Sequence, residues 1–329
     1  MRYYVRKFAF YLVALWAALT LNFFIPRLLP GNPVDILMAR LSQRGGTVDP
    51  SARRAFELML GTNSSESLFQ QYISYLGNML RGDLGISVSA FPAPVSEVIA
   101  TALPWTLMLV GIATFLSFAF GIVLGTFVGW RRGTWLDSLV PATTVLSAVP
   151  YFWLALLLVA VLSSAWGWFP LQGGYDILLS PGWNGEFIGS AIYYGTLPAL
   201  TIVISSVGGW LLGMRNMMVS STAEDYVLTA KAKGLRDSRI MIKYAARNAV
   251  LPSVAGFAIS LGFVVSGAVI TEQVFSYPGI GSKLLQAVQN NDYALMQGIF
   301  LVITVAVLGA NLVVDLLYAV IDPRTRVSG

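Results

Sequence analysis

The chain contains neither cysteine nor histidine. This absence excludes a thiol nucleophile, a disulfide, a zinc-finger site and a histidine general base, and with them most hydrolases and metalloenzymes. The phosphate-binding pattern G-x-x-x-x-G-K-[ST] is also absent, so the chain holds no Walker A nucleotide site. Charge is scarce as well, since 11% of the residues are charged, against about a quarter in soluble globular domains. We therefore expect no catalytic residue, cofactor or metal site.

Apolar sequence is what the chain has in excess, at 56% of its residues. Six apolar stretches are each long enough to cross a bilayer, which takes roughly 20 residues of helix: 8–25, 105–130, 139–166, 191–214, 250–271 and 294–321. The first stretch follows three bases and could be a signal peptide, but it lacks a small-residue cleavage site and is interpreted as a retained anchor. The sequence thus predicts an all-α integral membrane protein with six transmembrane helices.

The basic residues are distributed asymmetrically. Placing the N-terminus in the cytoplasm puts 14 of the 21 Lys and Arg residues on the cytoplasmic side of these spans, as the positive-inside rule requires. Both termini are then cytoplasmic in a multi-pass protein of the cell membrane, and the net charge of +5 needs no nucleic-acid partner. The predicted parts are an anchor helix (1–29), an extracytoplasmic region (30–100), a five-helix core (101–322) and a cytoplasmic tail (323–329).

Two segments face outward in this topology. Residues 30–100 are polar, with helix-like pieces at 50–60 and 66–81, and form a small region that is only marginally able to fold alone. Residues 167–185 and their flanks are rich in Trp and Tyr. These aromatics fit an interfacial belt at the membrane surface, or a surface that receives a substrate-loaded partner.

The loop 215–252 between the fourth and fifth spans is the one long basic interruption of the C-terminal half, with seven bases and three acids. Ser221-Thr222-Ala223-Glu224 fits a capping box at a helix start. Gly234 can end that helix in a left-handed conformation, and Asp237 or Ser238 can cap a second helix. Two short helices joined by a glycine elbow predict a docking element for a soluble partner.

This loop resembles the EAA loop of ABC-importer permeases, through L-T-A at 228–230, Gly234 and L-P at 251–252. Only the last Ala of E-A-A is present, and 17 residues separate Gly234 from Pro252. The longer spacing resembles the dipeptide/oligopeptide branch of that family. So do A-K-A-K-G-L (230–235), A-A-R-N-A-V-L-P (245–252), L-L-P-G-N-P (28–33), Y-L-G-N-M-L-R-G-D-L-G (75–85), Y-P-G-I-G (277–281) and D-L-L-Y-A-V-I-D-P-R-T-R (315–326).

The resemblance implies a permease subunit of an ATP-driven importer, embedded in membrane lipid. Its expected partners are a second homologous permease, two cytoplasmic ATP-binding subunits and an extracytoplasmic solute-binding protein. The branch carries di- and oligopeptides, and close relatives carry nickel or oligosaccharides. The alternative from another class is an ion- or proton-coupled secondary transporter or channel, which should show membrane-buried acid chains or paired broken helices.

The predicted coupling residues lie in and around the first loop helix: Glu224, Tyr226, Val227, Ala230, Lys231, Gly234 and Arg236. Tyr226, Val227 and Ala230 form an apolar stripe that we expect to dock into the ATPase. By resemblance, Ser260 and Ser266 line the pathway. Glu272 and Gln273 form either a gate or a solvated helix end.

Small residues and one acid in the spans are expected to serve helix packing. Gly208, Gly209 and Gly213 would allow helix backbones to approach closely. Asp315, near the cytoplasmic interface, would either cap a helix or form hydrogen bonds between helices.

Overall fold

The computed structural model describes residues 2–43, 52–60, 66–266 and 268–321. Every regular element among these residues is a helix, apart from one isolated bridge between Ile86 and Pro94, which confirms the all-α class. The chain divides into two compact units. The first unit comprises residues 1–106, 265–269 and 278–329, and the second comprises 107–264 and 270–277. The predicted tail, 323–329, lies outside the described residues.

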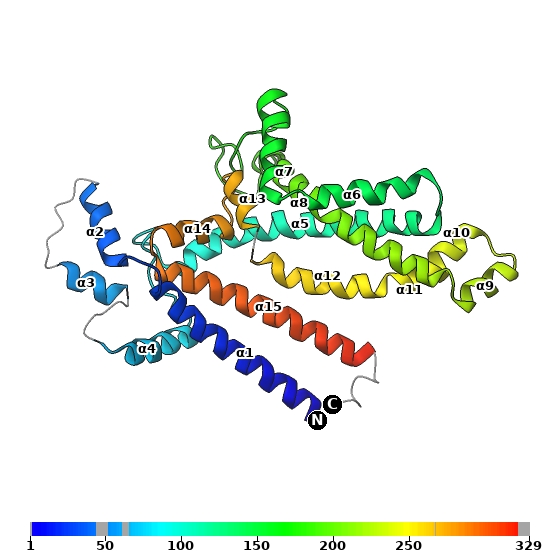
Figure 1. Ribbon diagram of the computed structural model, residues 1–329. Helices are drawn as coiled ribbons and strands as arrows, with labels where there is room; N and C mark the ends of the chain where they lie inside the picture. The colour runs from blue at the N-terminus through cyan, green and yellow to red at the C-terminus, as the bar shows by residue number, and fades with distance from the viewer. Residues whose placement is uncertain (1, 44–51, 61–65, 267, 322–329) are drawn as a thin grey trace. The chain divides into compact units, whose positions relative to one another are not determined.

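The first unit pairs the two ends of the chain. Its helices are α1 (Arg2–Arg27), α2 (Pro33–Gln43), α3 (Ala52–Met59), α4 (Leu68–Arg81), the first turns of α5 (Val95–Trp130), α14 (Ile280–Gln289) and α15 (Tyr293–Ile321). α1 and α15 lie side by side (Figure 1). Asp315 on α15 accepts a hydrogen bond from the Tyr11 hydroxyl at 2.8 Å and pairs with the Lys7 ammonium at 2.6 Å. Of the two structural roles predicted for Asp315, hydrogen bonding between helices is the one that the structure shows.

The core of the first unit lies where α5 begins. Val95, Ile99, Ile280, Leu295 and Ile299 are buried together there, from α5, α14 and α15. The extracytoplasmic helices predicted at 50–60 and 66–81 appear as α3 and α4, and α2 is an additional helix in that region.

The second unit holds the remaining helices. They are the rest of α5, the 3₁₀ turn η1 (Trp135–Ser138), α6 (Leu139–Ala148), α7 (Tyr151–Leu158), the π-helical η2 (Val159–Ala165), α8 (Gly185–Ser221), α9 (Asp225–Ala232), α10 (Asp237–Ile240), the π-helical η3 (Met241–Ala246), α11 (Arg247–Ala249), α12 (Leu251–Val264) and α13 (Val269–Val274, whose first residue belongs to the first unit).

α5 and α8 approach each other closely in the second unit. Gly121, Gly125 and Gly129 repeat every fourth residue of α5 and meet residues 210–218 in the C-terminal part of α8. A Cβ atom at Gly125 would lie 2.5 Å from the Leu211 carbonyl oxygen, so only glycine fits this approach. The glycines that the sequence suggested for this purpose behave differently, because a Cβ at Gly209 or Gly213 would meet nothing within 4 Å. That expectation was wrong for these two positions, since their side of α8 faces away from α5.

Four described helices are long and apolar enough to cross a membrane: Arg6–Arg27 within α1, Val95–Trp130, Gly185–Ser221 and Tyr293–Val313 within α15. A fifth span arises if Asp237–Ala249 and Leu251–Val264, which meet at a 50° bend, count as one. Pro252 lies at this bend, where it cannot donate a hydrogen bond to the preceding turn. The fifth predicted stretch, 250–271, is also shorter than expected, because α12 ends at Val264.

The third predicted span, 139–166, is not one continuous helix. α6 ends at Ala148 and α7 begins at Tyr151 (Figure 1). Pro150 explains the break, because a residue that precedes proline is pushed out of the helical region, and Val149 is extended with ψ 126°. The apolar helix that follows, Tyr151–Ala165, is shorter than the other spans.

Candidate functional site

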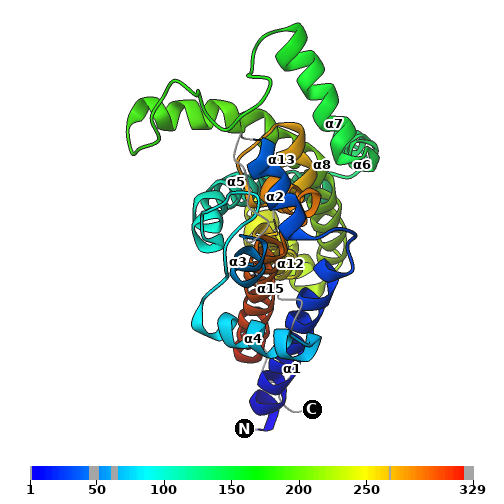
Figure 2. The same ribbon diagram turned by 90° about the vertical axis from the view of Figure 1, so that its left-hand side faces the viewer.

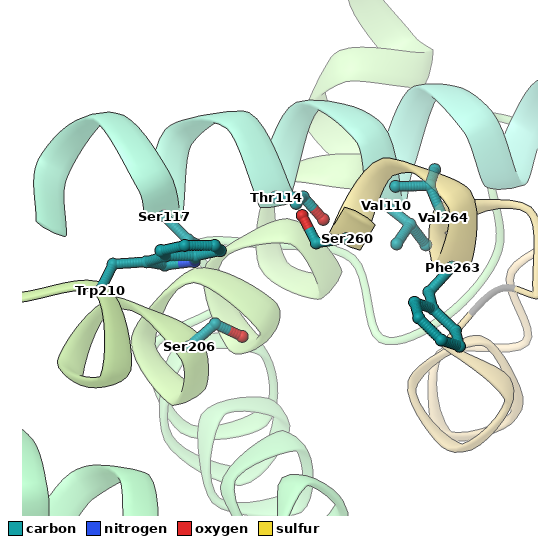
Figure 3. Close-up of a pocket in the computed structure, with 8 residues that line it drawn as sticks. All are labelled: Val110, Thr114, Ser117, Ser206, Trp210, Ser260, Phe263 and Val264. Atoms are coloured by element: carbon teal, nitrogen blue, oxygen red, sulfur yellow. The ribbon is translucent and has the colours of Figure 1, made fainter. Parts of the chain in front are cut away.

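A cavity of about 260 Å³ opens between three helices of the second unit (Figure 3). Its lining comes from α5 (Val110, Thr114, Ser117), α8 (Ser206, Trp210) and α12 (Ser260, Phe263, Val264). Ser260 and Ser266 were expected along the pathway by resemblance; Ser260 belongs to this wall, whereas the half-buried Ser266 lies outside it. The other seven residues were not predicted. Four of them carry a hydroxyl or an indole within an otherwise apolar stretch, which was their only signal in the sequence, and the three apolar ones carried none.

The cavity wall is uncharged and mostly apolar, with hydroxyl groups set among apolar side chains. Four of its side chains carry hydroxyl groups, and none of its lining residues ionises near neutral pH. Ser117 donates its hydroxyl hydrogen to the carbonyl of Ala113, and Ser260 donates to that of Phe257, both at 2.7 Å. Because these two hydroxyls donate their hydrogens within their own helices, their oxygens are available to a bound molecule mainly as hydrogen-bond acceptors.

A cluster of aromatic rings borders the cavity at Trp210. The rings of Phe118 and Phe257 stack with centroids 4.4 Å apart, and Trp210 meets Phe118 edge-on at 5.2 Å. A Cβ at Gly256 would contact the Trp210 ring at 3.6 Å. The indole is therefore held between two neighbouring helices, α5 and α12, and forms a firm side of the cavity.

Glu272 and Gln273 have different surroundings on α13. Gln273 is exposed, whereas Glu272 is completely buried. The interpretation of a solvated helix end is therefore wrong for Glu272 and stands for Gln273. Glu272 accepts a hydrogen bond through its carbonyl from the Tyr277 amide at 2.8 Å. Burial, and secondarily the Glu272 charge, raise the pKa of the Tyr277 phenol above its usual range.

The basic loop begins differently from the predicted capping box. α8 continues through Ser221, and α9 starts at Asp225 with Glu224 in the capping position but without a side-chain capping bond. The Ser221 hydroxyl instead bonds the Tyr226 hydroxyl at 2.7 Å and donates to the Ala245 carbonyl at 3.1 Å. The capping box was wrong because Ser221 is already helical and its hydroxyl ties α8 to both sides of the loop.

The glycine elbow has the predicted conformation. Gly234 has φ +70°, and its amide donates to the Lys231 carbonyl at 2.9 Å. The next amide, of Leu235, donates back to Ala230 at 3.4 Å, as expected for a left-handed helix end. The predicted caps of the second helix were wrong, because Arg236 holds the capping position and Asp237 is the first helical residue.

The predicted docking stripe is split between two faces of α9. Val227 is completely buried and Ala230 nearly so, in a cluster with Met214, Met218 and Ile240. These two residues therefore fix the loop to the end of α8 and are not available to a partner, so a solvent-facing stripe was wrong for them. Tyr226 is 37% exposed.

Solvent reaches a different set of side chains on the loop. Leu228 and Ile242 are more than half exposed, and the predicted coupling residues Glu224, Lys231, Gly234 and Arg236 are exposed as well. The Lys231 ammonium lies 5.5 Å from the centroid of the Trp130 ring at the end of α5. The solvent-exposed surface of the loop thus carries two separated apolar side chains among basic ones. Such a surface fits contact with an acidic or mixed protein surface.

Comparisons with known proteins agree with this architecture. The family described as "Binding-protein-dependent transport system inner membrane component" matches residues 121–327. The oligopeptide transport system permease protein AppB of Bacillus subtilis is 33% identical over 98% of both chains. The di/tripeptide permease DppB of Pseudomonas aeruginosa is 34% identical, and the dipeptide permease DppB of Escherichia coli is 32% identical, each over 93% of both chains. This multi-pass membrane chain therefore belongs to the family of binding-protein-dependent transport system inner membrane components.

Proposed function

We propose that this chain is the permease subunit of an ATP-driven importer that passes di- and oligopeptides delivered by an extracytoplasmic solute-binding protein. The observation that carries the proposal is similarity over nearly the whole length to relatives that are named as peptide permeases. Membership of a binding-protein-dependent family disfavours the secondary transporter or channel. The relatives reported above also favour peptides over oligosaccharides or nickel.

In this proposal the cavity between α5, α8 and α12 is part of the substrate passage. At about 260 Å³ it is smaller than the pockets of roughly 300 to 1,000 Å³ that enclose small ligands. A second, homologous permease would complete the passage, and six spans in this chain would require the broken α6–α7 segment to act as one of them. The uncharged wall suits peptides as a class, because they share backbone amides but differ in the charge of their side chains.

The loop from α9 to α11 would couple this passage to two cytoplasmic ATP-binding subunits. Its exposed face, with Leu228, Ile242, Lys231 and Arg236, would contact the ATPase. Its buried face packs Val227 and Ala230 on Met214 and Met218 of α8. Because packed interiors transmit displacement with little compression, movement of the ATPase would reach α8, which carries Trp210 and one wall of the cavity.

Reconstitution tests the proposed function. Proteoliposomes containing this chain, its partner permease and both ATP-binding subunits should accumulate a labelled tripeptide when ATP and the binding protein are supplied. Liposomes with this chain alone should accumulate none, because the sequence holds no nucleotide site. Gradient-driven uptake by the chain alone would support the secondary transporter, and uptake of an oligosaccharide in preference to peptides would refute the substrate class.

Paired substitutions on α9 test the coupling face. Leu228→Ser removes an exposed apolar contact and should lower co-purification of the ATPases and peptide uptake, with thermal stability unchanged. Val227→Ala, one residue earlier, removes a buried contact and should lower thermal stability. Should Leu228→Ser leave both binding and uptake intact, the exposed face of α9 is not the ATPase contact.

Thiol labelling tests the proposed orientation, with cytoplasmic termini and residues 30–100 outside. The chain has no cysteine, so single cysteines report without background. Ser74 on α4 and Ser238 on α10 are both exposed. A membrane-impermeant maleimide added to intact cells should label Ser74→Cys and spare Ser238→Cys. The reverse pattern would invert the topology.

A further inference from the structure

Helix α4 presents an apolar strip that nothing in the described part of the chain covers. The helix is well delimited, with Ser67 and Gln70 forming a capping box at its start and Gly82 ending it at φ +75°. Phe69, Ile73 and Leu80 lie on one side of it and are 72%, 52% and 90% exposed. At helical spacing these three side chains fall within one narrow sector, and the opposite side is polar.

A second apolar strip on α4, next to the first, packs against α1. Tyr72 and Tyr75 place their rings 5.2 and 5.5 Å from that of Phe23. The Tyr72 hydroxyl shares a hydrogen bond of 2.7 Å with Thr20, and its ring stacks on Phe24 at 6.4 Å. α4 is thus fixed to one of the helices that are apolar enough to cross the membrane.

The exposed strip is continuous with the exposed surface of α1. On α1, against which Tyr72 of α4 packs, Phe24 is 44% exposed and Leu21 is 59% exposed. An apolar surface therefore runs from Leu21 and Phe24 through the Tyr72 ring to Phe69 and Ile73, without a charged side chain among these residues. The surface of a spanning helix that faces no protein faces lipid. Lipid therefore borders the exposed side of α1 and the apolar strip of α4 that continues it.

Depth and direction agree with a position at the membrane surface. α4 contacts α1 between Thr20 and Phe24, three to seven residues before Arg27. At 1.5 Å per residue this is about 5 to 10 Å below the arginine, the depth to which interfacial helices bury their apolar face. Both views show α4 crossing α1 steeply instead of running alongside it (Figures 1 and 2), as a helix in the membrane plane would cross a spanning one.

We propose that α4 is an interfacial helix whose Phe69, Ile73 and Leu80 side chains insert among lipid acyl chains beside α1. Its polar side, with Ser74 and Asn78, faces water, and the exposed Arg81 can reach lipid phosphates. The lipid is that of the outer leaflet if the orientation proposed above holds, but the division of α4 into a lipid face and a water face does not depend on it.

This anchor would hold one end of the segment 68–94 against the bilayer. The other end is attached to the start of α15, where Asp292 accepts hydrogen bonds from the Ser87 hydroxyl and from the Ser89 amide at 2.8 Å. α4 lies between α1 and this contact in the sequence, so residues 68–94 are fixed at both ends. A rigid platform at the membrane surface is the consequence.

Fluorescence quenching by spin-labelled lipid tests the proposal on the assembled transporter. Single cysteines replace Ile73, Leu80, Ser74 or Asn78 and carry an environment-sensitive nitrobenzoxadiazole label. The complex is placed in phosphatidylcholine–phosphatidylglycerol nanodiscs, with or without a nitroxide near the headgroup end of the acyl chain. All four sites are exposed, so labelling leaves the core intact, and thermal stability verifies this for each variant.

Labels at Ile73→Cys and Leu80→Cys should lose most of their emission to the nitroxide lipid, while labels at Ser74→Cys and Asn78→Cys keep theirs. A water-soluble quencher should give the opposite ranking. Equal quenching of the two faces by the lipid would overturn the proposal, and so would protection of Ile73 and Leu80 from both quenchers, which would mean that a protein partner covers the strip.

Discussion

The two units of the chain hold their helices together by different means. In the first unit two carboxylates join segments that are far apart in sequence: Asp292 binds residues 87 and 89, and Asp315 binds Lys7 and Tyr11. In the second unit the contact between α5 and α8 has backbone lying against backbone at Gly121, Gly125 and Gly129. Polar bonds specify the contacts of the first unit, and close packing of backbones specifies the contact between α5 and α8.

The difference follows from the ways in which spanning helices can associate in lipid. In lipid the hydrophobic effect does not favour one helix pairing over another, so spanning helices associate through close packing or through polar bonds. Three glycines on one face give α5 and α8 extended contact, which suits two helices of 36 and 37 residues that carry the cavity between them. α1 and α15 are joined near the start of α1 and the end of α15 by the two polar contacts of Asp315, with Tyr11 and with Lys7.

The largest effect is expected from breaking the glycine contact. In Gly125→Leu the new Cβ would lie 2.5 Å from the Leu211 carbonyl oxygen and 2.8 Å from the Met214 Cβ. Backbone cannot rotate out of the way as a side chain can, so the cost should exceed the 3 kcal/mol or so that overpacked cores reach. We expect loss of folded protein in detergent, measured by fluorescence-detected size exclusion.

Gly213→Leu is the matched control, since it places the same side chain on α8 where a Cβ meets nothing within 4 Å. It should leave the yield and the thermal midpoint near those of the parent protein. If both variants are equally well folded, close backbone approach is not what joins α5 to α8.

The next largest effect should come from Asp292. Its buried carboxylate accepts bonds from the Ser87 hydroxyl, the Ser89 amide and, at 3.0 Å, the Leu295 amide at the start of α15. Asp292→Ala leaves these donors unpaired, which should lower the free energy of unfolding by about 3 kcal/mol. Thermal melting of the purified complex measures this. Asp83→Ala removes an exposed carboxylate that accepts a hydrogen bond from the Gly85 amide, and it should change the melting temperature little. An equally small effect of Asp292→Ala would contradict the buried network.

The smallest of the three effects concerns Asp315. Hydrogen bonds between membrane helices contribute about 0.6 kcal/mol on average, so Asp315→Asn should shift the melting temperature only slightly. Asp315→Leu should be worse, because it leaves Lys7 without the carboxylate at 2.6 Å. Adding Lys7→Met to Asp315→Leu should restore part of the loss. Additive effects in this double-mutant cycle would show that the two side chains do not stabilise each other.

Much of this protein could be predicted from its sequence because the responsible signals are local. Apolar runs of spanning length placed α1, α5, α8 and α15, since each run alone satisfies a bilayer. The left-handed Gly234 was predictable because a glycine closes a short helical pattern there. Ser260 was placed by resemblance alone, and the structure puts it in the cavity wall.

Some errors were local, such as the break at Pro150 inside the predicted span 139–166, and others came from features that depend on a second helix. Whether Val227 faces a partner or the chain's own core depends on Met214 and Met218, which lie a helix away. Whether a glycine serves close packing depends on what lies opposite: Gly125 and Gly213 each lie four residues from another glycine of an apolar span, although only Gly125 belongs to a run of three. The sequence by itself determined the long apolar helices and the glycine turn after α9, because these properties depend on neighbouring residues. The tertiary structure alone decided which face of each helix is covered, because burial depends on the atoms that another part of the chain brings into contact.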